Sequence, residues 1–270
     1  MPLEIETTKK FVPWKGWEVL LFFFVWFMMV WFMMQIVCAI AGGVVGYIAT
    51  SSQPQAPSAA MEQTHHGHPI AQLIEQSKNS PAALLVVFLT GVVVAPLIEE
   101  FLFRLLLQGW LEAKLLRYRV PFASGIAIIT VSFFFALIHA GNSTAMDGQM
   151  LLGMFTAINI GSLAFFTLGI LYLIGIRDVQ ITRYFFGTER RLRPQFFVNA
   201  GYCILALLVI VSISAGLDTL YPHSNMDPIP IFFFSVLLGI IYSRTQNLSY
   251  CILFHACLNG ISLVLTWLTV

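Results

Sequence analysis

Three short segments of this chain place side chains capable of acid–base chemistry in otherwise apolar surroundings. They read Ala95-Pro-Leu-Ile-Glu-Glu-Phe-Leu-Phe-Arg104, Phe133-Phe-Phe-Ala-Leu-Ile-His139 and Tyr250-Cys-Ile-Leu-Phe-His-Ala-Cys-Leu-Asn259. An ionisable side chain inside a membrane-spanning helix costs at least about 2.5–3.5 kcal/mol on insertion scales, so each one needs a compensating role. We therefore expect these polar side chains to converge on one water-filled cavity.

The two adjacent carboxylates of the first segment are expected to have different roles. On a helix, Glu100 and Arg104 are four residues apart and share a face, which predicts an ion pair between them. Glu99 is turned about 100° away from Glu100 by the helical pitch. A structural salt bridge therefore explains Glu100 and Arg104 but does not explain Glu99.

The other two segments supply imidazole and amide groups. His139 ends an apolar segment, which by itself is more typical of a packing or interfacial residue than of a catalyst. His255 and Asn259 are four residues apart and project from one face, and an isolated pair of this kind also fits a hydrogen bond between helices. Both side chains can donate to a developing oxyanion, and one such donor is worth about 2.7–4 kcal/mol.

The composition indicates a protein that lies within a membrane. Hydrophobic residues make up 58% of the 270 residues and charged residues 10%, with a mean hydropathy of +0.83. Soluble domains contain about 45–50% apolar and about 25% charged residues, so an ordinary soluble enzyme and a disordered chain are both excluded. The net charge of +1 leaves no cationic excess to bind nucleic acid.

Apolar segments of about 20 residues are long enough to cross a bilayer as helices. The sequence offers seven candidates, at 19–49, 82–107, 121–140, 150–176, 196–217, 229–242 and 248–270. Proline removes a backbone donor, so Pro96 could divide the second candidate into two helices and raise the count to eight. We therefore predict an all-α, polytopic membrane bundle of about seven or eight transmembrane helices.

The distribution of lysine and arginine predicts the orientation of this bundle. If the N-terminus is cytoplasmic, twelve Lys and Arg residues fall in connections on that side and only Lys78 falls on the other. This asymmetry is what the positive-inside rule describes. We predict a cytoplasmic interfacial N-terminus at 1–18, with Trp14 and Trp17 at headgroup level, followed by a first transmembrane helix at 19–50, an external polar loop at 51–81 and a helical core at 82–270.

The three polar segments resemble the motifs of the CAAX protease and bacteriocin-processing family, which is also called the Abi or CPBP family of intramembrane glutamic endopeptidases. Its patterns E-E-x-x-x-R, F-x-x-x-H and H-x-x-x-N are matched here by Glu99 to Arg104, Phe135 to His139 and His255 to Asn259. Their order, spacing and membrane setting all agree. The resemblance covers roughly residues 82–263.

The resemblance implies an endopeptidase that uses neither a metal nor another cofactor. It makes Glu99 the general base, His139 its partner in activating water, and His255 and Asn259 the oxyanion donors. Glu100 and Arg104 would support this arrangement. It also implies a peptide or protein substrate that is prenylated or unprenylated. The composition and charge indicate membrane lipids as partners and no nucleic acid, and the absence of targeting signals fits a prokaryotic cytoplasmic membrane.

Two other readings of the same residues stay open. Glu99, His139 and His255 would form a recognised set of zinc ligands, although the chain has no H-E-x-x-H sequence. A non-enzymatic transporter, scaffold or immunity protein could also use a polar cluster to bind a partner or conduct protons. The inverted repeats common in transporters are not evident in the sequence.

Overall fold

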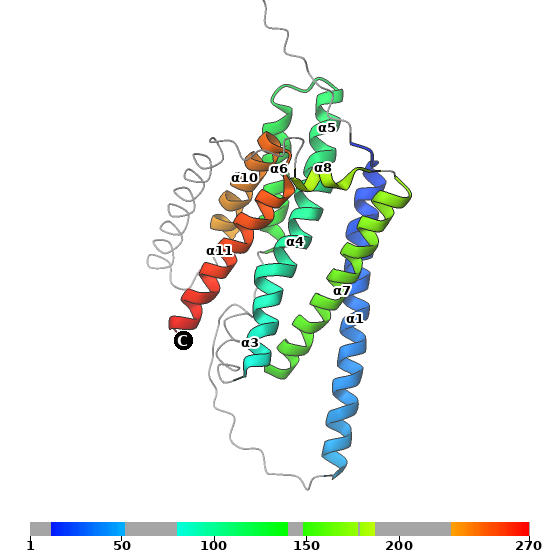
Figure 1. Cartoon of the computed structure of the whole chain (residues 1–270), viewed down its shortest axis with the longest axis vertical. Helices are drawn as coiled ribbons and strands as arrows, with labels where there is room; N and C mark the ends of the chain where they lie inside the picture. The colour runs from blue at the N-terminus through cyan, green and yellow to red at the C-terminus, as the bar shows by residue number, and fades with distance from the viewer. Residues whose placement is uncertain (1–11, 52–79, 140–147, 178, 187–227, 270) are drawn as a thin grey trace, which may run out of the picture. The chain divides into compact units, whose positions relative to one another are not determined.

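A computed structural model describes residues 12–51, 80–139, 148–177, 179–186 and 228–269 of the chain (Figure 1). Within these ranges every regular element is a helix. This confirms the prediction of an all-α protein. The predicted span at 196–217 lies outside the described residues.

Five of the described helices are long and apolar enough to cross a membrane, which makes the chain an integral, multi-pass membrane protein. They are Gly16–Ile36 within α1 (Gly16–Ser51), the continuous stretch Pro81–Arg117, Leu152–Gly175 within α7 (Gly148–Gly175), α10 (Pro228–Thr245), and Leu248–Leu268 within α11 (Leu248–Thr269). Helix α6 (Ala123–Ile138) is apolar but shorter, and α8 (Ile181–Phe186) is a short helix of six residues.

The stretch from Pro81 to Arg117 stays helical but changes its hydrogen-bonding pattern four times. It consists of α3 (Pro81–Phe88), the π-helix η1 (Leu89–Val94), α4 (Ala95–Glu99), the π-helix η2 (Glu100–Gln108) and α5 (Gly109–Arg117). The alternative in which Pro96 separates two helices is therefore not what the structure has. The hydrogen-bond ladder changes register before the proline, and this accommodates Pro96 without a break.

The described chain forms two compact units, of which the first comprises residues 1–22, 99–141 and 171–251. In this unit α6 packs against α5, η2 and α10. The approach of α10 is close, since a Cβ added to Gly239 would lie 2.9 Å from Cγ2 of Ile128. Every charged side chain within the described ranges belongs to this unit.

The second unit comprises residues 23–98, 142–170 and 252–270. Its buried core is apolar and is built on Val87 and Phe155. Helix α7 approaches α1 closely at Gly161, where an added Cβ would lie 3.0 Å from Cα of Val30.

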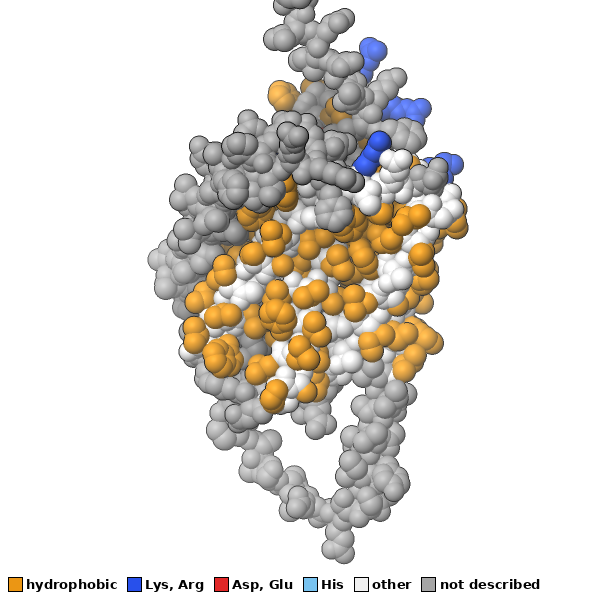
Figure 2. Space-filling model, viewed as in Figure 1, with side chains coloured by type: hydrophobic (Ala, Val, Ile, Leu, Met, Phe, Trp, Pro, Cys, Tyr) orange, Lys and Arg blue, Asp and Glu red, His pale blue; other side chains and the backbone are white. Residues whose placement is uncertain are grey.

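Much of the described surface is hydrophobic, as a membrane protein requires. Figure 2 shows apolar side chains spread over the face in view. Large side chains such as Phe24, Leu168 and Leu268 are more than half exposed. Apolar surface of this extent marks contact with a membrane rather than with water.

Candidate active site

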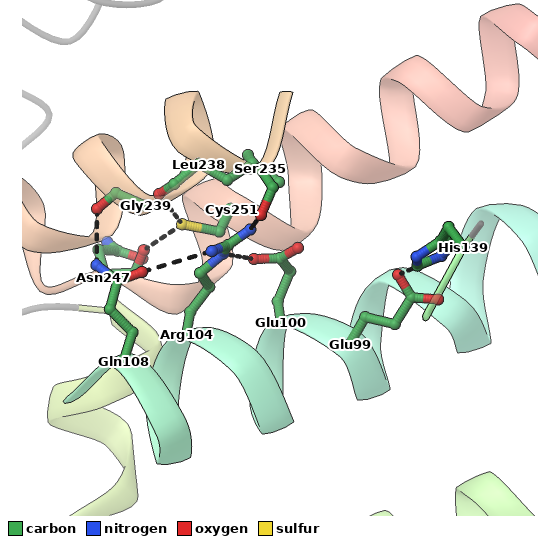
Figure 3. Close-up of polar contacts among 10 residues, drawn as sticks. All are labelled: Glu99, Glu100, Arg104, Gln108, His139, Ser235, Leu238, Gly239, Asn247 and Cys251. Atoms are coloured by element: carbon green, nitrogen blue, oxygen red, sulfur yellow. Dashed lines mark hydrogen bonds and ion pairs between the residues drawn. The ribbon is translucent and has the colours of Figure 1, made fainter. Parts of the chain in front are cut away.

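Glu99 and His139, which are forty positions apart in the sequence, face each other in the first unit (Figure 3). Glu99 is the last residue of α4, and His139 directly follows the last residue of α6. Oε2 of Glu99 lies 3.9 Å from Nε2 of His139, and the two side chains are 19% and 30% exposed. This separation is too long for a direct hydrogen bond, but one water molecule can bridge it.

Phe135 fixes the orientation and the tautomer of His139. Nδ1 of His139 lies 2.7 Å from the carbonyl oxygen of Phe135. Since a carbonyl only accepts, Nδ1 carries the hydrogen and donates it, so that in the neutral form of the ring the lone pair lies on Nε2, toward Glu99. The ring of Phe135 also lies against the imidazole, with 4.6 Å between ring centroids.

Glu100 makes the ion pair that the sequence predicts. Nε of Arg104 donates to Oε2 of Glu100 at 3.0 Å, and both side chains are fully buried. In Figure 3, Glu100 points toward Arg104 and α10, whereas Glu99 points toward His139. One helical step therefore separates a neutralised carboxylate from one that is still partly accessible.

Two residues that the sequence analysis missed complete the surroundings of Arg104. Nη2 of Arg104 donates to Oγ of Ser235 on α10 at 2.7 Å, and Nη1 donates to Oε1 of Gln108 at 3.5 Å. Nε2 of Gln108 in turn donates to the carbonyl oxygen of Gly239 at 2.9 Å. The guanidinium also lies over the ring of Phe135, 5.6 Å from its centroid. This buried network joins η2 to α10 and to α6.

Both missed residues have a signal in the sequence. Gln108 continues the four-residue spacing of Glu100 and Arg104, so it lies along the same side of a helix. Ser235 is a single polar residue in the apolar run from Ile231 to Ile241 that needs a partner when it is buried.

His255 and Asn259 lie on the part of α11 that belongs to the second unit. The side chain of His255 is buried. Nδ2 of Asn259 donates to the carbonyl oxygen of Gly91 at 2.8 Å. The convergence of these two residues with Glu99 and His139 stays a prediction.

The bond from Asn259 has a local cause in the π-helix η1. The backbone N–H of Ala95 donates to the carbonyl of Thr90, five residues earlier. In this register the carbonyl of Gly91 would accept from residue 96, but Pro96 has no N–H. Asn259 replaces the missing donor, so its amide has a structural use, and the second hydrogen on Nδ2 stays available for another acceptor.

In the described ranges, no three His, Cys, Asp or Glu side chains gather closely enough to hold a metal ion.

The fold and these residues define a multi-pass helical membrane protein in which a buried polar network lies next to the partly exposed pair of Glu99 and His139. The type II CAAX prenyl endopeptidase family, described as Rce1-like, matches residues 81–261, about two thirds of the chain, and the chain belongs to this family. This confirms the family resemblance and makes the chain a membrane endopeptidase that acts on a peptide or protein. No curated protein and no solved structure matches the chain.

Proposed function

We propose that the chain hydrolyses a peptide bond in a membrane-associated peptide or protein, with Glu99 and His139 activating the attacking water. The observation that carries this proposal is the geometry of the pair. A carboxylate oxygen lies 3.9 Å from an imidazole nitrogen whose tautomer is fixed by Phe135. Both groups are acceptors, so one water molecule can donate a hydrogen to each.

In the proposed reaction the oxygen of this water attacks the carbonyl carbon of the substrate. The proton it loses passes to Glu99, while Nε2 of His139 accepts the second hydrogen and holds the water in line. The carbonyl oxygen becomes an oxyanion. When the C–N bond of the tetrahedral intermediate breaks, Glu99 returns its proton to the leaving amine.

We assign oxyanion stabilisation to His255 and Asn259. Asn259 uses one amide hydrogen for the carbonyl of Gly91 and keeps the other for the substrate. The side chain of His255 is 5% exposed, so any hydrogen bond it makes to substrate forms in a low-dielectric environment, where such donors are most effective. The family pattern supports this assignment.

Glu100 and Arg104 are proposed to support the site without touching the substrate. Both are fully buried, and Arg104 reaches α10 through Ser235 and lies over Phe135, whose carbonyl orients His139. The pair therefore connects the helix that ends at Glu99 with the residue that positions its partner.

The topology and the host membrane are also part of the proposal. We propose seven transmembrane helices, with residues 1–18 on the cytoplasmic side, 19–50 as the first crossing, 51–81 outside and 82–270 as the protease core of a prokaryotic cytoplasmic membrane protein. The twelve-to-one distribution of Lys and Arg supports this orientation. The family name supports a substrate that ends in a prenylated C-a-a-X sequence.

The substitution Glu99→Gln tests the base assignment. We expect kcat to fall by about 10²- to 10⁴-fold, the usual contribution of general acid–base catalysis, with an unchanged melting temperature. The assay is cleavage in detergent of a fluorogenic peptide that ends in a farnesylated C-a-a-X sequence, alongside the same peptide without the lipid. Undiminished turnover by this variant would refute the assignment.

Glu112→Gln is the matched control, because Glu112 is a buried carboxylate on the same helical stretch. It accepts hydrogen bonds from Ser124 and Ser243, in α6 and α10. We expect this variant to keep its kcat.

Metal independence is tested separately. Full activity after chelator treatment, with no metal by elemental analysis, supports it, and activity that returns only with added zinc contradicts it.

A further inference from the structure

The segment 12–22, at the start of the described chain, precedes the region that the family covers, yet it is built into the unit that contains Glu99 and His139. Trp14, Glu18 and Phe22 are between 1% and 8% exposed, whereas Trp17 is 57% exposed. The sequence predicts both tryptophans at headgroup level. That depth stays a prediction; in the structure Trp14 is a core residue and Trp17 lies on the surface.

Trp14 makes a buried hydrogen bond to the helix that follows Glu99. Its indole N–H donates to the carbonyl oxygen of Leu106 at 3.1 Å. Leu106 lies near the end of η2, where the π-helix returns to the α-helical pattern. At this junction the N–H of Gly109 is shared between the carbonyls of Arg104 and Leu106, five and three residues earlier. The indole therefore supplies a donor to the stretch of backbone where the hydrogen-bond ladder changes register.

Close packing surrounds this bond. A Cβ on Gly16 would lie only 2.6 Å from Cζ2 of Trp110, so the backbone of the segment lies directly on that indole ring. The ring of Phe22 meets the ring of Phe101 edge to face, with 6.0 Å between centroids. Phe101 directly follows Glu100 in the sequence. The segment thus contacts the helix near both ends of η2.

Glu18 fastens the segment to the end of α7. Its carboxylate accepts from the hydroxyl of Tyr172 at 2.7 Å and from Nη2 of Arg177 at 3.2 Å. Arg177 also donates to the carbonyl of Pro13, the residue before Trp14. A buried carboxylate with these partners is costly to displace, so the indole of Trp14 is held in a fixed position.

The register of η2 matters for the site because it sets the direction of the residues before it. A shift of one residue turns a side chain by about 100° around the helix axis. Such a turn would carry Glu99 away from Nε2 of His139. The other π-helix, η1, also has a backbone carbonyl that accepts a hydrogen bond from a distant side chain, in that case the amide of Asn259.

We propose that Trp14 is a positioning residue for the peptidase reaction: its indole N–H, through Leu106, holds the π-helical register that points Glu99 at His139. This rests on the proposed function of Glu99. It makes a segment outside the family region a part of the enzyme.

The test compares the full-length Trp14→Phe variant with Trp17→Phe, a matched loss of an indole from the exposed side of the same segment. A second variant carries 3-benzothienylalanine at position 14, which keeps the shape of the indole but has no N–H. Two measurements are made in detergent: hydrogen exchange of the backbone amides at 104–112, and kcat and KM for the farnesylated C-a-a-X peptide.

We expect both position-14 variants to exchange these amides about tenfold faster than the wild type, a change that corresponds to about 1.4 kcal/mol, within the range of one buried hydrogen bond. We also expect kcat to fall by a similar factor with KM unchanged, and Trp17→Phe to match the wild type.

Loss of packing alone would affect Trp14→Phe but spare the benzothienyl variant, and that result would overturn the proposal. Unchanged exchange in both position-14 variants would also overturn it. A wild-type protein that does not cleave the peptide would count against the proposed function, while the exchange data would still decide whether Trp14 holds the register.

Discussion

Removal of Arg104 should destabilise the protein far more than removal of any exposed arginine. Arg104 is fully buried, and it donates to Glu100 at 3.0 Å and to Ser235 at 2.7 Å. Arg104→Met leaves the carboxylate of Glu100 buried without its counter-ion. Breaking a buried pair in this way costs about 3–5 kcal/mol. Since folded domains are stable by only about 5–15 kcal/mol, the variant should lose a large fraction of its stability.

The double variant Glu100→Gln/Arg104→Met separates the charge from the packing. Without the carboxylate no charge is left buried and unpaired, so we expect the double variant to recover about 2 kcal/mol relative to Arg104→Met. The remaining deficit comes from Ser235 and Gln108, which both lose a hydrogen-bond partner.

The free energy of unfolding of each variant is measured by titration with SDS in mixed micelles and monitored by circular dichroism. Arg183→Met is the control, because Arg183 is an exposed arginine on α8, and its loss should change stability by no more than about 0.5 kcal/mol. Our account of the network is refuted if the double variant is as unstable as Arg104→Met, or if Arg104→Met costs no more than the control.

Three further predictions concern the backbone. If Asn259 replaces the donor that Pro96 lacks, Asn259→Ala should lower the free energy of unfolding by about 1–3 kcal/mol. This loss should be smaller in a Pro96→Ala background, which restores an N–H to the helix. Equal losses in both backgrounds would contradict the replacement. Gly239→Ala should cost about 1–3 kcal/mol, because its Cβ would lie 2.9 Å from Ile128 and 3.1 Å from Oε1 of Gln108. Gly125→Ala, on α6 where an added Cβ meets nothing within 4 Å, should instead stabilise the protein by about 0.4–1 kcal/mol, as measured by the same SDS titration.

The sequence predicted the parts of the site that depend on regular helical spacing. The ion pair of Glu100 and Arg104 follows from their separation of four residues, and the different direction of Glu99 follows from the helical pitch. The all-α fold and the membrane setting follow from composition and from the lengths of the apolar segments. The roles of Glu99, His139, His255 and Asn259 in catalysis stay predictions.

The parts that could not be predicted depend on contacts between distant segments. The backbone carbonyls of the π-helices accept hydrogen bonds from the side chains of Asn259 and Trp14, which are 168 and 92 positions away from the residues they contact. The helix propensity of a local segment does not depend on such distant donors, so it cannot predict where a π-helix forms. Trp14 shows the same limit, because a tryptophan beside lysines is typical of a membrane interface and its burial depends on helices far along the chain.

Phe135 controls two separate degrees of freedom of His139. Its carbonyl decides which ring nitrogen carries the hydrogen, and its ring limits rotation of the imidazole. Both constraints exist before any substrate arrives, so the free energy of arranging the histidine is spent during folding rather than in each turnover. If His139 orients the attacking water as proposed, a phenylalanine four residues before it lowers the kinetic barrier, although its own side chain has no group that can accept a proton from that water.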